Sequence, residues 1–262
     1  MPNIDKHAPG TFAWAELGTT DQAAAKQFYT GLFGWQYEDH DMGPAGTYST
    51  VKANGRDIAG CYKLDSKMLE MGIPPHWMLY VGVASADEMA AKAKEAGGTV
   101  LQGPFDVMTL GRMAVIKDPT GAVFSIWEPK MHQGIGLAGE PGTLCWADLN
   151  THKPDEAKAF YSKVFGWEIS LGENDKSGYL HIKNGQEFIG GIPPMKNAPA
   201  SMPAHWLQYY LVTDIDASTG KAKELGGRVW MGPMDIENVG KMTVLADPQG
   251  AALALFQPNP RQ

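Results

Sequence analysis

The sequence predicts an α+β protein of two similar halves, each built from two β-α-β-β-β units. The first observation is an internal repeat: residues 9–35 match residues 141–167 at 14 of 27 positions, and residues 75–127 match residues 204–256 at 22 of 53. The second is that strand-like alternation and helix-like apolar spacing follow each other in the same order in both halves. A chain of 262 residues is long enough for the two domains that such a duplication implies.

The first unit begins with a predicted strand over Thr11–Leu17. A helix follows, because Thr20 or Asp21 can accept hydrogen bonds from the free N–H groups at its start, an apolar stripe through Phe28 covers one side, and Gly34 can end it. Three further strands complete the unit, at Gln36–His40, Thr47–Ala53 and Ile58–Leu64.

The second unit repeats this order with a strand over Trp77–Val83 and a helix over Asp87–Ala96 that Gly97-Gly98 stops. Its remaining strands are predicted at Val100–Gly103, Arg112–Lys117 and Val123–Trp127. Since the second half follows the same pattern, the predicted domains are residues 9–128 and 141–258, with a Gly-rich linker at 129–140 and a loose arm at 1–8.

Composition excludes several classes of protein. The net charge of −7 and the absence of a Lys/Arg cluster argue against a nucleic-acid surface. We find no secretory leader at the N-terminus and no apolar run of the roughly 20 residues that a membrane span needs. Cys61 and Cys145 lack CxxC spacing and are predicted to be buried thiols, so we expect a cytoplasmic protein.

Four short motifs recur at matching places in the two halves. Phe28-Tyr29 and Leu32-Phe33-Gly34-Trp35 end the first helix, Gly97-Gly98 follows the second helix, and Asp118-Pro119-Thr120-Gly121 precedes the last strand. This combination resembles the vicinal oxygen chelate superfamily, which includes glyoxalase I, extradiol dioxygenases and bleomycin-resistance proteins. The resemblance covers nearly the whole chain. It implies two cup-shaped, glyoxalase-like domains in tandem.

In metal-dependent members of that family, His, Gln or Glu side chains from four strands hold a divalent metal inside the cup. The equivalent positions here are Trp14 and Trp146 on the first strand, residues near Ala59-Gly60 and Ile189-Gly190 on the fourth, residues at or near Met78 and Leu207 on the fifth, and Ser125 and Ala254 on the last. None of these is an ordinary metal ligand, so we expect no metal residues and no cofactor. The alternative is a relocated divalent metal on Glu16 with His76, or on Asp148 with His205.

Strand alternation predicts which side chains face each cup, with Phe12, Trp14 and Glu16 on one side of the first strand. The expected ligand-binding residues of the first cup are Trp14, Glu16, His76, Met78, Tyr80, Ser125 and Trp127; those of the second are Trp146, Asp148, His205 and Tyr209. Glu16 and Asp148 are the candidate catalytic residues. A mostly apolar cup with few polar groups is typical of a small-molecule pocket.

Each candidate also has a structural interpretation. The two Trp side chains can fill the space of the missing metal instead of stacking on a ligand. The carboxylates of Glu16 and Asp148 can pair with Arg112 and Lys241. The imidazoles of His76 and His205 can make structural hydrogen bonds beside the Pro-rich loops that precede them.

Three functions are compatible with the sequence. The first is a metal-free protein that binds a small organic molecule in an apolar cup. The second is a divalent-metal-dependent lyase or dioxygenase of the glyoxalase type with an altered site, in which Glu16 or Asp148 acts as general base. The third is a structural module whose cups are solid cores. We expect a small-molecule partner, no nucleic acid, no membrane, and a monomer that imitates a dimer or a homodimer. If one cup functions, the first is favoured because it retains more polar groups.

Overall fold

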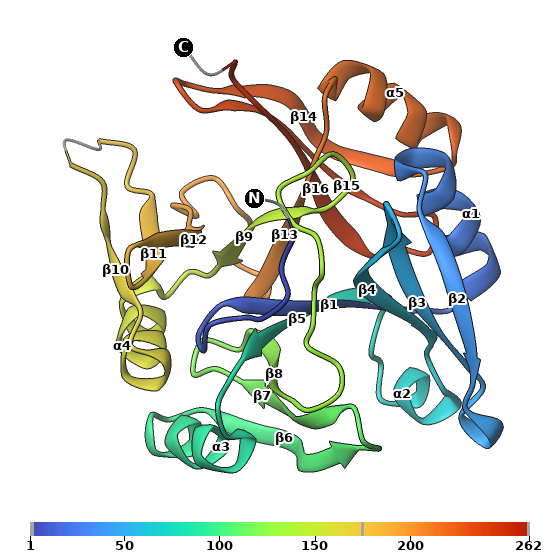
Figure 1. Cartoon of the computed structure of the whole chain (residues 1–262). Helices are drawn as coiled ribbons and strands as arrows, with labels where there is room; N and C mark the ends of the chain where they lie inside the picture. The colour runs from blue at the N-terminus through green and yellow to red at the C-terminus, as the bar shows by residue number, and fades with distance from the viewer. Residues whose placement is uncertain (1–2, 174–175, 261–262) are drawn as a thin grey trace.

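The computed structural model describes residues 3–173 and 176–260, which form two eight-stranded sheets with helices packed on them (Figure 1). The strands of the first sheet are ordered β2-β3-β4-β1-β5-β8-β7-β6, and those of the second β10-β11-β12-β9-β13-β16-β15-β14. Each sheet therefore contains two β-α-β-β-β units that are consecutive in sequence. The predicted α+β fold with four such units is confirmed.

The first half contains β1 Phe12–Thr19, α1 Gln22–Phe33, β2 Gln36–Asp41, β3 Thr47–Ala53, β4 Arg56–Lys63, α2 Ser66–Glu70, β5 His76–Gly82, α3 Ala86–Glu95, β6 Thr99–Val107, β7 Gly111–Lys117 and β8 Val123–Pro129. The second contains β9 Leu144–Asn150, α4 Pro154–Phe165, β10 Glu168–Leu171, β11 Leu180–Asn184, β12 Glu187–Ile192, β13 His205–Leu211, α5 Ile215–Glu224, β14 Arg228–Ile236, β15 Gly240–Ala246 and β16 Ala252–Pro258. The short helix α2 and a 3-10 turn at Gly43–Ala45 were not predicted.

The ends of α1 follow the predicted capping chemistry. The Asp21 carboxylate accepts a hydrogen bond from the backbone N–H of Ala24 at 3.0 Å. Gly34 ends the helix with a φ of 74°, in the left-handed region that favours glycine, and its N–H bonds to the carbonyl of Thr30. Of the two predicted caps, Asp21 is therefore the one used.

A β-bulge in β1 changes the predicted alternation. Phe12 pairs with Val81 and Trp14 with Tyr80, so Ala13 is an extra residue on its strand. Phe12 consequently does not share the cup face with Trp14. Its ring packs edge-on against Trp167 at 5.8 Å and Trp206 at 5.6 Å, in the other half of the molecule. The prediction that Phe12 faces the first cup is wrong because a period-two pattern does not reveal a bulge. The same irregularity recurs at Cys145 in β9.

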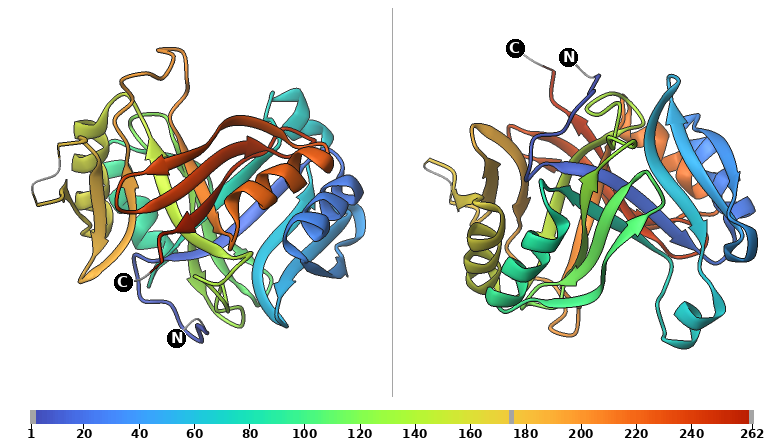
Figure 2. Two further views of the ribbon diagram at one scale, coloured as in Figure 1. Left: turned by 90° about the horizontal axis from the view of Figure 1, so that it is seen from above. Right: turned by 60° about the horizontal axis from the view of Figure 1, so that its bottom comes forward.

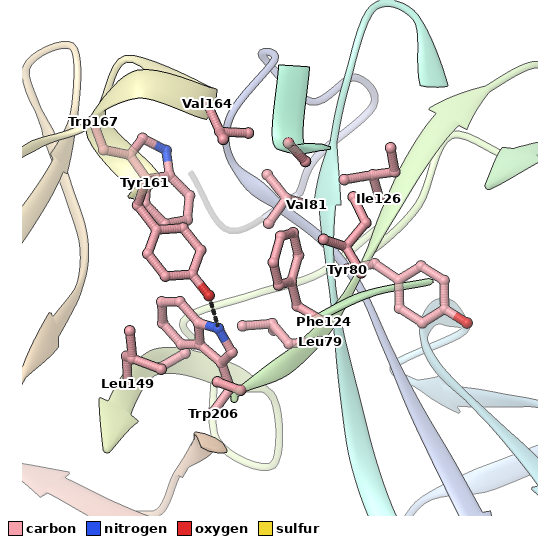
Figure 3. Packing of buried hydrophobic residues seen from close by; sticks show 14 of the residues in the cluster. Leu79, Tyr80, Val81, Phe124, Ile126, Leu149, Tyr161, Val164, Trp167 and Trp206 are labelled. Atoms are coloured by element: carbon pink, nitrogen blue, oxygen red, sulfur yellow. Dashed lines mark hydrogen bonds between the residues drawn. The ribbon is translucent and has the colours of Figure 1, made fainter. Parts of the chain in front are cut away.

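The recurring motifs meet where the two halves pack together. The Tyr29 hydroxyl donates to Asp247 Oδ2 at 3.0 Å and accepts from Trp77 Nε1 at 2.9 Å. With the halves exchanged, Tyr161 donates to Asp118 at 2.9 Å and accepts from Trp206 at 2.9 Å, which is the dashed contact in Figure 3. All these side chains are buried. The tyrosine of the Phe-Tyr motif and the aspartate that opens the Asp-Pro motif therefore recur because they pack between the halves.

The helices also pack across the halves. Helix α1 lies beside α5, and α3 lies beside α4 (Figures 1 and 2). Trp35 Nε1 donates to the carbonyl of Gly142 at 2.7 Å, and Trp167 Nε1 donates to that of Gly10 at 2.8 Å. These contacts add to the packing between the two halves.

The predicted loose arm is held by the linker. The N–H of Ile4 bonds to the carbonyl of Gly136 at 3.0 Å, Asn3 pairs with Leu137, and His7 Nε2 lies 2.9 Å from the carbonyl of Ile135. Across residues 3–173 and 176–260, no helix combines the length and apolar character required to cross a bilayer.

Candidate functional site

A carboxylate–tyrosine cluster lies at the centre of the first cup. Glu16 Oε1 accepts a hydrogen bond from the Tyr48 hydroxyl at 2.9 Å, and Oε2 accepts one from Tyr80 at 2.7 Å. Trp14 Nε1 donates to the Tyr48 hydroxyl at 3.2 Å. The strand register produces this arrangement, since Trp14 lies opposite Tyr80 and Glu16 lies opposite Met78. Trp14, Glu16 and Tyr80 are thus brought together as predicted from the sequence.

The second cup contains the same cluster with a shorter acid. Asp148 accepts hydrogen bonds from Tyr179 at 2.5 Å, Tyr209 at 2.8 Å and Trp146 Nε1 at 3.1 Å. Trp146 Nε1 also lies 2.8 Å from the Tyr179 hydroxyl. With three donors, the Asp148 carboxylate is more completely satisfied than that of Glu16.

Two glycines make room for these clusters. In β4, Gly60 lies beside Glu16, and a Cβ added at Gly60 would overlap the Tyr48 hydroxyl. In β12, Gly191 lies beside Asp148, and an added Cβ would overlap Tyr179 in the same way. The fourth-strand position at which the family places a metal ligand therefore admits a tyrosine hydroxyl because it lacks a side chain.

Burial sets the protonation of both acids. Desolvation raises the pKa of Glu16, and the hydrogen bonds from Tyr80 and Tyr48 partly oppose that rise. Desolvation likewise raises the pKa of Asp148 against the hydrogen bonds from Tyr179, Tyr209 and Trp146. Each acid therefore releases its proton less readily than an exposed carboxyl group.

The donors at the family's metal positions do not match those of a divalent metal site. Trp14 and Trp146 stand on the first strands. On the fourth, the strand pairing places Gly60 beside Glu16 and, one residue beyond the predicted Ile189-Gly190, Gly191 beside Asp148. Indole rings and glycines supply no metal-binding side-chain atom. Within residues 3–173 and 176–260, no three His, Cys, Asp or Glu side chains gather closely enough to hold a metal. The two-ligand site on Glu16 and His76 stays a prediction.

The two predicted histidines bond to the loops before them. His76 Nδ1 lies 2.8 Å from the carbonyl of Pro74, and His205 Nδ1 lies 2.9 Å from that of Pro203. Burial lowers the pKa of His76. In the described structure, Glu16 receives its hydrogen bonds from Tyr48 and Tyr80 and not from this imidazole.

The prediction that Glu16 and Asp148 pair with Arg112 and Lys241 is wrong. Arg112 instead forms a double hydrogen bond with Asp87 at 2.7 and 2.9 Å, and Lys241 lies 3.8 Å from Asp216. Both basic side chains project to the outer surface, where they are paired with exposed acids.

Around its carboxylate, the first cup is more open than the second. Four equivalent positions carry partly exposed side chains in the first cup and buried ones in the second; the pairs are Glu16 and Asp148, Met78 and Leu207, Met113 and Met242, and Val115 and Val244. In the second cup, Leu207, Tyr209, Met242, Val244 and Ala254 form a cluster of their own. A ligand that reaches the carboxylate therefore meets less obstruction in the first cup.

The linker covers one side of the first cup. The imidazole ring of His132 packs edge-on against Trp14 at 4.5 Å and lies 6.0 Å from Trp127. Trp127 Nε1 donates to the carbonyl of His132 at 3.0 Å. The predicted residues Trp14 and Trp127 are thus brought together, with a ring from the linker between them and the solvent.

Ser125 adds a buried hydroxyl to the first cup. It lies beside Tyr80 in the parallel pairing of β5 and β8, and its Oγ is buried without a hydrogen-bond partner among the described residues. The equivalent residue in the second cup is Ala254, which lies beside Tyr209. An unpaired hydroxyl is costly to bury, so this serine is a candidate contact for a bound polar atom.

Sequence reasoning missed Tyr48, Tyr179 and His132. The two tyrosines lie in the stretch between the aligned segments, where the halves differ in length. In both halves the tyrosine follows two small residues, Gly46-Thr47 and Ser177-Gly178. A comparison of the residues at the start of the third strands would have found this pattern.

Comparison with known proteins identifies the family. The sequence profile of the Glyoxalase/Bleomycin resistance protein/Dioxygenase superfamily matches residues 11–126 and 143–255, and this chain belongs to that family. It is 42% identical over 270 residues to "Putative glyoxylase CFP32" of Mycobacterium tuberculosis, covering 100% of both chains. It is 33% identical over 268 residues to "Anthracycline biosynthesis protein DnrV" of Streptomyces peucetius, covering 97% of this chain and 95% of that one.

Solved structures share the fold. The Mn(II)-bound glyoxalase from Novosphingobium aromaticivorans superposes with a TM-score of 0.64 at 18% identity, covering 96% of this chain and 83% of that one. A variant of homoprotocatechuate 2,3-dioxygenase from B. fuscum gives a TM-score of 0.67 at 15% identity, covering 99% and 74%. At these identities the likeness concerns the fold alone.

Proposed function

We propose that this protein binds a small, mostly apolar organic molecule in the first cup, without a divalent metal. The observation that carries the proposal is the replacement of metal ligands by a hydrogen-bonded cluster. Trp14 stands at the first-strand position, and Tyr48 reaches Glu16 through the space that Gly60 leaves open. Because these groups satisfy one another, the cup needs no metal to hold its carboxylate.

The composition of the open cup supports an apolar ligand with one hydrogen-bond donor. Met78, Met113 and Val115 offer partly exposed apolar contacts, and methionine adapts well to irregular ligands. Glu16 is partly exposed and accepts only two hydrogen bonds from protein side chains in the described structure. An ionised carboxylate has room for about four, so a ligand hydroxyl can donate to it.

A flat aromatic ligand fits this chemistry best. Trp14 and Tyr80 give the cup two aromatic rings beside Glu16. The relative DnrV is named for anthracycline biosynthesis, which extends the proposal to fused-ring phenols. Aromatic pairs of this kind add about 0.5–1.5 kcal/mol beyond the area they bury.

The test is a titration of 1-hydroxyanthraquinone, a fused-ring phenol, into protein dialysed against a chelator. We expect saturable binding at one site, weakened about tenfold or more by Glu16→Gln, since hydrogen bonds to charged groups contribute about 1.5–3 kcal/mol. Met78→Phe, which fills the first cup, should weaken binding, and Leu207→Phe in the second cup should leave it unchanged. Binding that is equally sensitive to both Phe substitutions would contradict the assignment to the first cup.

The second candidate is a lyase of the glyoxalase type, which the name of the relative CFP32 supports. In that case Glu16 is the general base, because burial raises its pKa and makes it a better proton acceptor. The assay is turnover of the methylglyoxal–glutathione hemithioacetal with and without added Mn²⁺ or Zn²⁺. Turnover that Glu16→Gln abolishes and Asp148→Asn spares would favour the enzyme. Absence of turnover under all these conditions would leave the binding function as the sole proposal.

A further inference from the structure

The two halves differ at an open groove beside Trp146. This groove has a volume of about 300 Å³ and lies between the N-terminal arm and the strands β9 and β12. Its lining includes Lys6, His7, Cys145, Trp146, Phe188 and Ile189. Small-molecule pockets typically begin at about 300 Å³ and are mostly apolar with few polar groups. The groove is separate from the Glu16 site, because Phe12 is its one lining residue from a strand of the first half and no member of the Glu16 cluster lines it.

In the first half, the chain itself covers the equivalent place. The N–H of Ile135 donates to the carbonyl of Ala13 at 2.8 Å, and the N–H of Gly136 donates to that of Asp57 at 2.7 Å. The ring of His132 packs on Trp14. The strand registers make Cys145, Trp146 and Phe188 the counterparts of Ala13, Trp14 and Asp57. In the second half, no loop N–H among the described residues donates to the carbonyls of Cys145 and Phe188 in this way.

A change of residue alters the charge of the groove. In the first half, the Asp57 carboxylate pairs with Lys52 at 2.8 Å. In the second half, Phe188 replaces that aspartate, and the Lys183 ammonium lies over its ring at 4.6 Å from the centroid. Lys6, on the opposite wall, is exposed. Neither lysine belongs to an ion pair among residues 3–173 and 176–260.

The aromatic walls are available for contact. Phe188 is 52% exposed, which is unusual for a large apolar side chain on a structured strand. Trp146 is partly exposed, although its Nε1 bonds to Asp148 and Tyr179. Cys61 is buried as predicted, whereas Cys145 is partly exposed because it lines the groove. Desolvation still raises the pKa of the Cys145 thiol to about 12, so this residue contributes a neutral apolar surface.

We propose that the groove between the N-terminal arm and Trp146 is a second binding site, for a flat aromatic molecule that carries a negative charge. The aromatic ring lies against Trp146 and Phe188, as the imidazole of His132 lies against Trp14 in the first half. The anionic group faces Lys6 and Lys183. Lys183 is the counterpart of Lys52 and lacks the carboxylate that Asp57 provides there. Binding at this site is non-covalent.

The experiment uses 2-naphthoate as probe and 2-naphthamide as its neutral match, titrated into the full chain by calorimetry at low salt. We expect one saturable site for naphthoate and weaker binding of the amide. Phe188→Asp restores the first-half residue, and it should weaken naphthoate binding about tenfold, because it removes an aromatic contact and adds a like charge. Lys6→Gln should weaken naphthoate about threefold, as expected for an exposed charge pair, and leave the amide unchanged.

Matched variants separate this site from the first cup. Lys67→Gln on α2 and Met78→Phe in the first cup should leave naphthoate binding unchanged, whereas Met78→Phe weakens 1-hydroxyanthraquinone. Phe188 and Lys6 are exposed, so their variants are expected to keep the unfolding transition of the parent. The proposal is overturned if naphthoate shows no saturable binding up to millimolar concentration, or if Phe188→Asp and Lys6→Gln bind it as well as the parent does.

Discussion

Gly60 and Tyr48 share one space in the first cup: the Tyr48 hydroxyl lies where the Cβ of any larger residue at position 60 would stand. This relationship recurs between Gly191 and Tyr179 in the second cup. In each cup, a tyrosine in or just before the third strand thereby bonds to the carboxylate of the first strand. The arrangement occupies the part of the cup in which metal-dependent relatives keep a ligand.

Replacing Gly60 by alanine should displace Tyr48 from Glu16. We expect Gly60→Ala to lower the free energy of unfolding by about 1.5–3 kcal/mol, since the hydrogen bond from Tyr48 to the Glu16 carboxylate is lost. Urea denaturation followed by fluorescence measures this change. Gly220→Ala is the matched control: its added Cβ meets no atom within 4 Å, and it lies inside α5. That variant should stabilise the protein by up to about 1 kcal/mol.

Tyr29→Phe should weaken the contact between the halves. The change leaves Asp247 Oδ2 and Trp77 Nε1 without their buried partner, for which we expect a loss of about 2–4 kcal/mol. Tyr161→Phe removes the equivalent contacts with Asp118 and Trp206 and should cost a similar amount. Chemical denaturation of both variants measures the loss. A large effect of one substitution and none of the other would show that the two contacts are not energetically equivalent.

The raised pKa of Glu16 predicts a dependence of stability on pH. Because the folded protein holds this proton more tightly than the unfolded chain, the contribution of Glu16 is most favourable below its ordinary pKa of 4.5. It is lost as the pH rises through the higher folded pKa. The difference in unfolding free energy between the parent and Glu16→Gln should therefore decline from pH 4.5 upwards. A difference that increases with pH over that range would indicate a lowered pKa instead.

Removal of the unpaired Ser125 hydroxyl should have opposite effects on the stability of the protein and on its affinity for the ligand. Ser125→Ala introduces the residue of the second cup and should be neutral or stabilise the free protein by up to about 1 kcal/mol. The reverse change, Ala254→Ser, should cost about 1–3 kcal/mol by burying a hydroxyl group. If Ser125 contacts the ligand, Ser125→Ala will bind 1-hydroxyanthraquinone less tightly despite its equal or greater stability. Thermal denaturation and titration of the same samples measure both effects.

Much of the fold could be predicted because its signals are local. The strand and helix order, the cap at Asp21 and the end of α1 at Gly34 follow from residues adjacent in sequence. The position of Trp14 and Glu16 on one face also followed from alternation. Phe12 could not be placed, because the bulge at Ala13 is set by pairing with β5.

The tyrosines that donate hydrogen bonds to Glu16 and Asp148 are distant from these carboxylates in sequence. Tyr48 reaches Glu16 across 32 residues, from a strand in the segment where the halves differ in length. The hydrogen bond between Tyr29 and Asp247, at the interface of the two halves, joins residues that are 218 positions apart. The covering of Trp14 by His132 depends on the path of the linker, whose Gly-rich sequence carries no periodic pattern. Such contacts require the three-dimensional structure.

The central claim is that the first cup binds its ligand through Glu16 without a metal. The most direct measurement is the affinity of 1-hydroxyanthraquinone for the parent protein before and after exhaustive dialysis against a chelator, with the metal content determined on the same samples. We predict equal affinities in the two states and a loss of about tenfold or more in Glu16→Gln. Binding that disappears on chelation and returns with stoichiometric Mn²⁺ or Fe²⁺ would contradict the claim.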